Sequence, residues 1–310
     1  MTVLITGSDG FVGSHLLETC PASLGQIFSP TFNELDLTDS QSVRDYLAGK
    51  KIHYCIHSAT TLRNKTTYPT NVCELNLRMF FNLVRYLPED CRIVNLGSGS
   101  EYTRELWHDN MQEESFLDSI PKDSHSLSKY IISKFIHTNT HDRLVTLRIF
   151  GIYGEREHYL YKFISNTIVK TLYGISANIN QDAVFNYIDV RDFCRVLYLL
   201  LPKPELYCLG SVNVGYPHNY KLSDITSYIL DLTGKTQTLP YKVLSSTMGN
   251  PYTPSLQRMQ SLLPVSYQFT PILDSISRLI SYYSSILQTL NLDMLIADDY
   301  LNYAKSIMKQ

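Results

Sequence analysis

The first residues of the chain hold the feature that most limits what it can fold into. An apolar run, Val3–Thr6, is followed at once by Gly7, Gly10 and Gly13, and a helical pattern starts at the last of these glycines. Glycines at this spacing let the chain turn tightly, let backbone approach a phosphate and let the helix pack closely on the strand. The helix N-terminus then faces the phosphates. The segment therefore predicts a dinucleotide-binding loop.

Strand-like and helical patterns alternate after this loop. In chain order we expect strands and helices at Val3–Thr6, 13–19 (helix), Gln26–Ser29, 40–48 (helix), Tyr54–Ser58, 72–86 (helix), Arg92–Leu96, 126–138 (helix) and Val145–Phe150. This alternation is typical of an α/β fold with a doubly wound parallel sheet and helices on both faces. We expect residues 1–154 to form the dinucleotide-binding domain. Residues 155–310, richer in Tyr, Asn, Ser and Pro, form a smaller substrate-binding region, of which about 184–200 returns to the first domain.

Composition limits the partners. The net charge is −2 and no long Lys/Arg run occurs, which argues against nucleic acid. No apolar run is long enough for a membrane span, and the start of the sequence shows no leader, so we expect a cytoplasmic protein without membrane attachment. The six cysteines form no CxxC pair and are interpreted as structural. His53 and His57 lie on or beside a strand without an acidic third ligand, so no metal site is expected.

Seven segments occur in the order and spacing of the extended short-chain dehydrogenase/reductases. They are TGSDGFVG, ELDLTD, IHSAT, NLGSGSEY, HSLSK, LRIFGIYG and FNYIDVRDF. The chain resembles this superfamily over about residues 1–280, and the run 33–59 is most similar to the GDP-fucose synthases and related epimerase/reductases. The resemblance implies a Rossmann domain with a small C-terminal substrate domain, a nucleotide-sugar substrate, and a homodimer formed through the helices at 72–86 and 126–138.

The resemblance also implies the cofactor contacts. They involve Gly7, Gly10, Phe11, Val12 and Gly13 at the pyrophosphate, Asp36 and Leu37 at the adenine, and Ala59 and Lys129. GDP-fucose synthases place an arginine in the glycine loop against the extra phosphate of NADP, whereas this chain has Ser8 and Asp9 there. A carboxylate repels a phosphate, so NAD is preferred over NADP. No acidic residue stands at the end of the 26–29 strand to hold the ribose hydroxyls.

The catalytic positions match the superfamily with one departure. Ser98 and Lys129 match its serine and lysine, but His125 stands where its tyrosine belongs. A histidine exchanges protons near neutral pH, and four residues before Lys129 it lies on the same helical face. Proximity to the ammonium disfavours the imidazolium and leaves a neutral base. A second frame, Tyr130 with Lys134, also has the Tyr-x-x-x-Lys spacing, but it is rotated by about 140° around the helix.

Three residues are candidates for sugar contacts. Ser100 aligns with the cysteine that GDP-fucose synthases use in epimerisation, and His158 lies close to, but not at, their partner histidine. On that basis a 3,5-epimerase is not asserted. Glu101 follows Ser98 on the same loop and either touches the sugar or faces solvent. Asn76 matches a helix asparagine that braces the active-site loop in such folds.

Two functions of different classes remain open. The first is an NAD(P)-dependent epimerase, dehydratase or keto-reductase of a nucleotide-activated sugar that uses Ser98, His125 and Lys129. The second is a dinucleotide-binding relative that has lost its chemistry with the tyrosine and serves as a partner subunit or sensor. Retention of the glycine loop, Asp36, Ser98 and Lys129 favours the enzyme, because a degenerating site loses several such residues.

Overall fold

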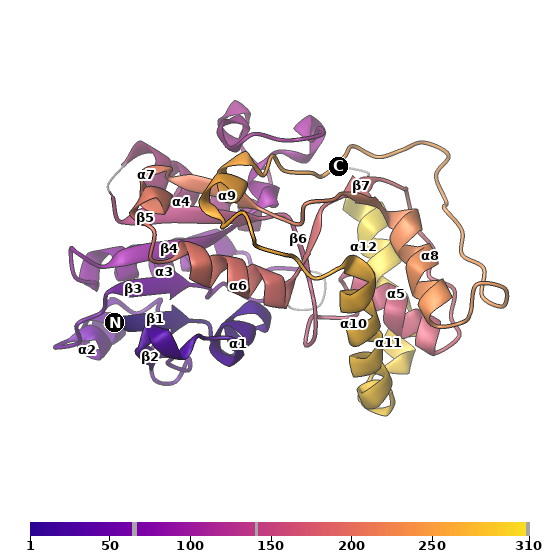
Figure 1. Cartoon of the computed structure of the whole chain (residues 1–310), viewed down its shortest axis with the longest axis horizontal. Coiled ribbons are helices and arrows are strands. Elements are labelled where there is room, and N and C mark those ends of the chain that lie inside the picture. The colour runs from indigo at the N-terminus through magenta and orange to yellow at the C-terminus, as the bar shows by residue number, and fades with distance from the viewer. Residues whose placement is uncertain (64–66, 140–141, 308–310) are drawn as a thin grey trace. The chain divides into compact units, whose positions relative to one another are not determined.

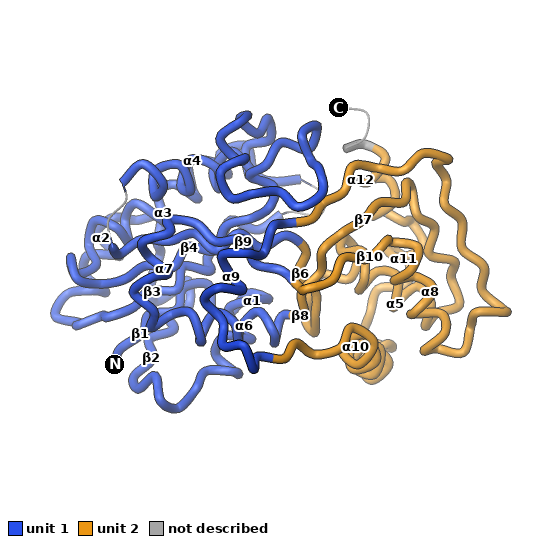
Figure 2. The backbone as a smooth tube through the Cα atoms, turned by 45° about the horizontal axis from the view of Figure 1, so that its top comes forward, with its two compact units in different colours: residues 1–150, 190–215, 254–267 blue, residues 151–189, 216–253, 268–310 orange. Residues whose placement is uncertain are grey.

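The computed structural model describes residues 1–63, 67–139 and 142–307 and has two compact units (Figure 2). Unit 1 comprises the described residues of 1–150, 190–215 and 254–267, and unit 2 those of 151–189, 216–253 and 268–310. The domain boundary expected between residues 154 and 155 thus lies between 150 and 151. The segment expected to rejoin the first domain at about 184–200 corresponds to residues 190–215 of unit 1. Residues 254–267 also belong to unit 1, which the sequence did not predict.

Unit 1 is built on one six-stranded parallel sheet in the order β2-β1-β3-β4-β5-β9 (Figure 1). Its strands are β1 (Thr2–Thr6), β2 (Gln26–Phe28), β3 (Tyr54–His57), β4 (Arg92–Ser98), β5 (Leu144–Ile149) and β9 (Ser211–Val214). The chain runs from β1 outward to β2 and then back to β3 on the other side. The carboxyl ends of β1 and β3 therefore form the switch point where such sheets bind ligands. The predicted α/β class is confirmed.

Two groups of helices flank this sheet (Figure 1). The helices of unit 1 are α1 (Phe11–Glu18), α2 (Ser40–Leu47), α3 (Val72–Tyr86), α4 (Ser124–Thr138), α6 (Val190–Leu200), α7 (Pro204–Cys208) and α9 (Gln257–Leu262), with short 3-10 turns η1 (Ala22–Leu24), η2 (Gly99–Glu101), η3 (Arg104–Leu106) and η4 (Glu113–Asp118). Helix α1 packs on α6, while α3 packs on both α2 and α4. The turn η2, which follows β4 directly, packs against α4.

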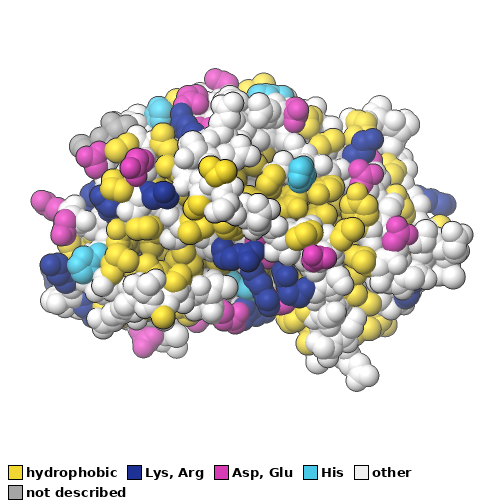
Figure 3. Space-filling model, viewed as in Figure 1, with side chains coloured by type: hydrophobic (Ala, Val, Ile, Leu, Met, Phe, Trp, Pro, Cys, Tyr) yellow, Lys and Arg dark blue, Asp and Glu magenta, His cyan; other side chains and the backbone are white. Residues whose placement is uncertain are grey.

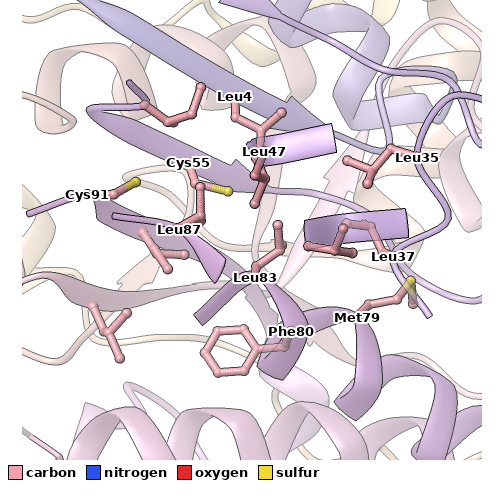
Figure 4. Packing of buried hydrophobic residues seen from close by; sticks show 14 of the residues in the cluster. Leu4, Leu35, Leu37, Leu47, Cys55, Met79, Phe80, Leu83, Leu87 and Cys91 are labelled. Carbon is pink, nitrogen blue, oxygen red and sulfur yellow. The ribbon is translucent and has the colours of Figure 1, made fainter. Parts of the chain in front are cut away.

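The core under α2, α3 and α4 fixes the strand ends from which the site loops start (Figure 4). Leu4 of β1 and Cys55 of β3 belong to one cluster with Phe80 and Leu83 of α3, and all four side chains are fully buried. The apolar residues of α3 recur at helical spacing, which explains why its predicted and observed bounds agree. Truncating a side chain such as Leu83 to alanine in such a core costs about 2–5 kcal/mol.

Unit 2 has two small sheets and a helical cluster. Its elements are β6 (Gly151–Tyr153), α5 (Phe163–Leu172), β7 (Val184–Phe185), β8 (Tyr187–Asp189), β10 (Tyr220–Lys221), α8 (Leu222–Leu232), α10 (Ile272–Ile286), η5 (Leu287–Thr289), α11 (Leu292–Ile296) and α12 (Asp299–Ile307). Strands β6 and β8 pair in parallel, and β7 pairs with β10 in antiparallel fashion. Leu295 of α11 is buried in the core of this unit, so this C-terminal helix packs against the rest of unit 2.

Charged side chains on the face drawn in Figure 3 occur in small groups, with Lys and Arg near Asp and Glu. This agrees with the small net charge of −2. In the described part of the chain no helix combines the length and apolar character that a membrane crossing requires.

Candidate active site

The glycine loop between β1 and α1 has a shape that side chains would destroy. Gly7 has a φ of 67°, and a Cβ added there would lie 2.7 Å from the Cα of Ala59. A Cβ on Gly13 would lie 2.1 Å from the carbonyl oxygen of Gly7. A Cβ on Gly10 would meet that same oxygen at 3.2 Å and no other described atom within 4 Å. The loop is therefore closed on its inner side and open at Gly10, as close approach of a pyrophosphate requires.

The first turn of α1 adds backbone donors to this loop. Gly10 caps the helix without a side-chain hydrogen bond, and Phe11 and Val12 form the first helical positions. The first amides of a helix lack partners within the helix and favour an anion. The predicted backbone contacts of Phe11 and Val12 with a pyrophosphate are thus sterically available, and they stay a prediction.

The loop after β2 places Asp36 beside a tight turn. One oxygen of Asp36 accepts hydrogen bonds from the amide and the hydroxyl of Thr38, at 2.8 and 2.7 Å. Asp39 is the N-cap of α2 and accepts a hydrogen bond from the amide of Gln41 at 2.9 Å. Leu37 buries its side chain in the core, so a contact of this residue with adenine would use its backbone.

The carboxyl ends of β1 and β3 are joined by side chains. Thr6 Oγ1 lies 3.0 Å from His57 Nδ1 and accepts a hydrogen bond from the amide of Ala59 at 3.3 Å. Burial, and then the charge of Lys129, lower the pKa of His57 to about 3, so its imidazole is neutral. His53 accepts a hydrogen bond from the amide of Thr2 at 3.0 Å. Both histidines thus have roles within the sheet.

A capping box shapes the turn that carries Ser98. Ser98 ends β4 and caps η2: its hydroxyl oxygen accepts from the amide of Ser100 at 3.1 Å, and Glu101 Oε1 accepts from the amide of Ser98 at 2.9 Å. Such reciprocal bonds satisfy the donors of a helix start. The two bonds fix the Ser98 hydroxyl at the carboxyl end of β4, beside the edge where ligands bind.

Glu101 forms a buried ion pair below this turn. Its Oε2 lies 2.5 Å from Nε of Arg148 on β5, and both side chains are 0% exposed. Arg148 also donates to the carbonyl of Glu113 and to the hydroxyl of Ser211. Despite the opposing effect of burial, interactions with Glu101 raise the pKa of Arg148. The expectation that Glu101 touches the sugar or faces solvent is therefore corrected: it supports the Ser98 turn from beneath.

Lys129 is buried on α4 next to the same turn. Its Nζ donates to the carbonyl of Leu96 at 2.9 Å, and η2 packs on α4. Burial lowers the pKa of Lys129 to about 8, although the nearby Glu101 carboxylate favours the ammonium. The structure thus brings the Ser98 turn and Lys129 together, as the sequence predicts. His125 lies one turn earlier on α4 and is half-buried.

The second Tyr-x-x-x-Lys frame lies elsewhere on α4. Tyr130 is buried and packs edge-on against Phe116, with ring centroids 5.7 Å apart. Lys134 is exposed. Because Lys129 reaches β4 while Tyr130 packs against η4, this arrangement favours the frame that contains His125.

Ser100 and His158 are the remaining candidates for sugar contacts. The Ser100 hydroxyl oxygen is buried, and no described residue hydrogen-bonds to it. His158 belongs to unit 2, where its ring lies 4.7 Å from that of Tyr161. Burial lowers the pKa of His158. Contacts of either residue with a substrate stay predictions.

Two residues near the site were missed in the sequence. The sequence could have indicated the role of Arg148, because an arginine inside the apolar strand LVTLRIF must find a buried acidic partner. Nothing in the sequence indicates the role of Tyr68, which precedes α3 in a polar stretch. Its ring nevertheless stacks on that of His125, with centroids 4.2 Å apart.

The parallel sheet, the glycine loop at its switch point and a buried lysine beside a serine turn define a Rossmann-type dinucleotide-binding protein with acid/base groups. The sequence model of the NAD dependent epimerase/dehydratase family matches residues 3–215. The chain belongs to this family. The predicted class of enzyme, an NAD(P)-dependent epimerase, dehydratase or reductase, is confirmed at the level of the family.

Individual relatives are distant but cover most of the chain. The chain is 23% identical over 286 residues to the GDP-6-deoxy-D-talose 4-dehydrogenase of Aggregatibacter actinomycetemcomitans, which covers 88% of this chain and 94% of that protein. It is 22% identical over 254 residues to the GDP-L-fucose synthase of Azorhizobium caulinodans, with coverages of 75% and 80%. The structure of the NADP-bound GDP-mannoheptose C4 reductase of Campylobacter jejuni matches with a TM-score of 0.75 at 17% identity, covering 91% of this chain and 98% of that one. This last likeness concerns the fold.

Proposed function

We propose that the chain transfers a hydride between NAD(P) and C4 of a GDP-activated sugar, as a dehydrogenase or keto-reductase. The observation that carries the proposal is the buried Lys129 held against the strand that ends in Ser98. The GDP-sugar class is supported by the names of the relatives, which include a GDP-sugar 4-dehydrogenase and a GDP-fucose synthase.

The residues of unit 1 fit a dinucleotide. In the proposal Gly7, Gly10 and Gly13 give the pyrophosphate close access to backbone, and Phe11 and Val12 present helix amides to it. Asp36 and the backbone of Leu37 flank the adenine, with Ala59 next to the glycine loop and Lys129 at the nicotinamide ribose. The exposed Asp9 in the glycine loop disfavours an extra phosphate, so NAD is preferred over NADP.

Three side chains act on the reacting hydroxyl group, and one of them transfers its proton. When bound, the nicotinamide ring supplies or accepts the hydride. In the oxidising direction, His125 takes the proton of the C4 hydroxyl as the C4–H bond breaks, and Ser98 donates a hydrogen bond to the same oxygen. The Lys129 ammonium stabilises negative charge that develops there. In the reducing direction His125 returns the proton to the new alkoxide.

Ser100 limits the reaction to redox chemistry. It stands where GDP-fucose synthases carry a cysteine, and a serine hydroxyl is a far weaker acid than a thiol, whose ordinary pKa is about 8.5. Proton exchange at the carbons beside a keto group is therefore not part of the proposal. In the proposal Ser100 is a hydrogen-bonding partner of the sugar, and a sugar contact of His158 in unit 2 stays a separate prediction.

The test is mass spectrometry of GDP-, UDP-, CDP- and dTDP-sugars, including 4-keto-sugars, incubated with the protein and NAD(H) or NADP(H) in deuterated water. The expected result is oxidation or reduction of a GDP-sugar without deuterium on carbon. Deuterium on carbon would replace the proposal with an epimerase or dehydratase that passes through an enol. A homodimer through α3 and α4 and a cytoplasmic location belong to the same proposal, and light scattering tests the dimer.

A second candidate function follows from His125, which replaces the tyrosine of the superfamily. In it the chain binds a dinucleotide and acts as a partner subunit or sensor. Tight cofactor binding with no change in any sugar nucleotide would favour it over the enzyme.

A further inference from the structure

Tyr68 and His125 stack face to face in unit 1, although they are far apart in the sequence. Their ring centroids are 4.2 Å apart and their planes differ by 4°. Both residues are half-buried, and the guanidinium carbon of Arg63 lies over the same tyrosine ring, 4.7 Å from its centroid. Overlap of this kind restrains the tilt of the imidazole. Because both nitrogens lie in the ring plane, the stack also limits the directions in which they point.

A chain of hydrogen bonds ties Thr61, which follows β3, to the turn of α4 that carries His125. Asn76 Oδ1 accepts from the amide of Thr61 at 2.9 Å, and Asn76 Nδ2 donates to Ser128 Oγ at 2.9 Å. Ser128 Oγ donates to the carbonyl of His125 at 2.6 Å. Asn76 and Ser128 are buried. The carbonyl of His125 is therefore connected through Ser128 and Asn76 to Thr61, while its ring is stacked on Tyr68.

We propose that Tyr68 is the positioning residue of His125, and that its ring, not its hydroxyl, holds the imidazole in the orientation for proton exchange with the sugar. The inference rests on the proposed function, because it takes His125 as the acid/base. An imidazole on the first turn of a helix otherwise rotates about two bonds. Ordering a reacting group in advance removes that entropy cost from the catalytic step.

Two substitutions separate the ring from the hydroxyl. Tyr68→Phe keeps the stack and is expected to retain most of the wild-type kcat. Tyr68→Leu removes it and is expected to lower kcat by about 10–100-fold, as small misplacements of reacting groups do, with cofactor affinity unchanged. Equal losses in both variants would overturn the proposal, because the phenol hydroxyl would then be the group required.

A matched control comes from Tyr46 on α2. This tyrosine is also half-buried with a cation over its ring, since Nζ of Lys50 lies 4.2 Å from the centroid. Tyr46→Leu is expected to leave kcat at the wild-type value. If Tyr46→Leu lowered kcat as much as Tyr68→Leu does, the cause would be general destabilisation of the protein. That result would contradict the positioning role of Tyr68.

A chemical readout tests the stack without turnover. Diethyl pyrocarbonate acylates accessible imidazoles, and peptide mass mapping gives the rate at His125 alone. Tyr68→Leu is expected to raise this rate several-fold, and Tyr68→Phe to leave it unchanged. An acylation rate of His125 that Tyr68→Leu does not change would show that the two rings do not stack in solution. If the wild-type protein alters no sugar nucleotide, the proposed function fails, while these rates still decide whether Tyr68 holds His125.

Discussion

The two halves of the candidate site in unit 1 are built in different ways. The glycine loop is a backbone structure, in which the absence of side chains at Gly7, Gly10 and Gly13 creates the space. The acid/base half depends on charged and polar side chains from β4, η2, α4 and β5, and at its centre lies the buried pair of Glu101 and Arg148. Except at Lys129, which the proposal places in both halves, cofactor binding and proton transfer should therefore fail independently when each half is altered.

The largest effect is expected at Arg148 in the acid/base half. Arg148→Met leaves the Glu101 carboxylate buried without its ion pair, which should cost about 3–5 kcal/mol of unfolding free energy. The double variant Glu101→Gln/Arg148→Met should recover part of that loss, because no uncompensated charge remains. Urea denaturation measures both. A loss below about 1 kcal/mol in the single variant, the level of an exposed pair, would contradict the account.

The glycine half is expected to respond to a single methyl group. Gly13→Ala places a Cβ 2.1 Å from the Gly7 carbonyl oxygen, so the backbone must move, at about 1–3 kcal/mol of stability, with loss of cofactor binding. Gly10→Ala has a longer contact, so it should stay folded and bind cofactor more weakly. Calorimetric titration with NAD and NADP reports both. Unchanged affinity in Gly13→Ala would show that this loop does not hold the cofactor.

Electrostatics of the acid/base half predict a pH dependence. The pKa of Lys129 is lowered to about 8, so activity that needs the ammonium should decline as the pH rises through 8. Glu101 raises that pKa; Glu101→Gln should therefore lower it and move the alkaline limb to lower pH. A pH–rate profile measures the shift, and carbon NMR of Lys129 does so without turnover. A limb that moves to higher pH would reverse the assigned role of Glu101.

The smallest effect is expected at the adenine end. Thr38→Val removes the hydroxyl that donates a hydrogen bond to Asp36, so the unfolding free energy should fall by about 0.5–1.5 kcal/mol and cofactor binding should weaken several-fold. Asp39→Ala provides the contrast. It removes the cap of α2 and should cost about 0.5–2 kcal/mol of stability without loss of affinity. The opposite pattern would place the adenine contact at Asp39.

The same contrast explains what could be predicted. The glycine loop and the bounds of α3 follow from local patterns, namely glycine spacing and apolar periodicity. Strand β9 was missed because its four residues pair with β5 from a distant part of the chain. The Glu101–Arg148 pair and the Tyr68–His125 stack depend on the fold in the same way. Ser98, His125, Lys129 and the bracing Asn76 could be named from their motifs, but the supporting contacts of Arg148 and Tyr68 could not.

The most direct test of the central claim compares hydride transfer by the wild-type protein, His125→Ala and His125→Tyr, with the GDP-sugar identified by mass spectrometry. The account predicts that His125→Ala lowers the rate by at least about 100-fold at unchanged cofactor affinity, and that His125→Tyr, which restores the tyrosine of the superfamily, keeps measurable turnover. Wild-type rates in His125→Ala would remove this histidine from the mechanism and contradict the account.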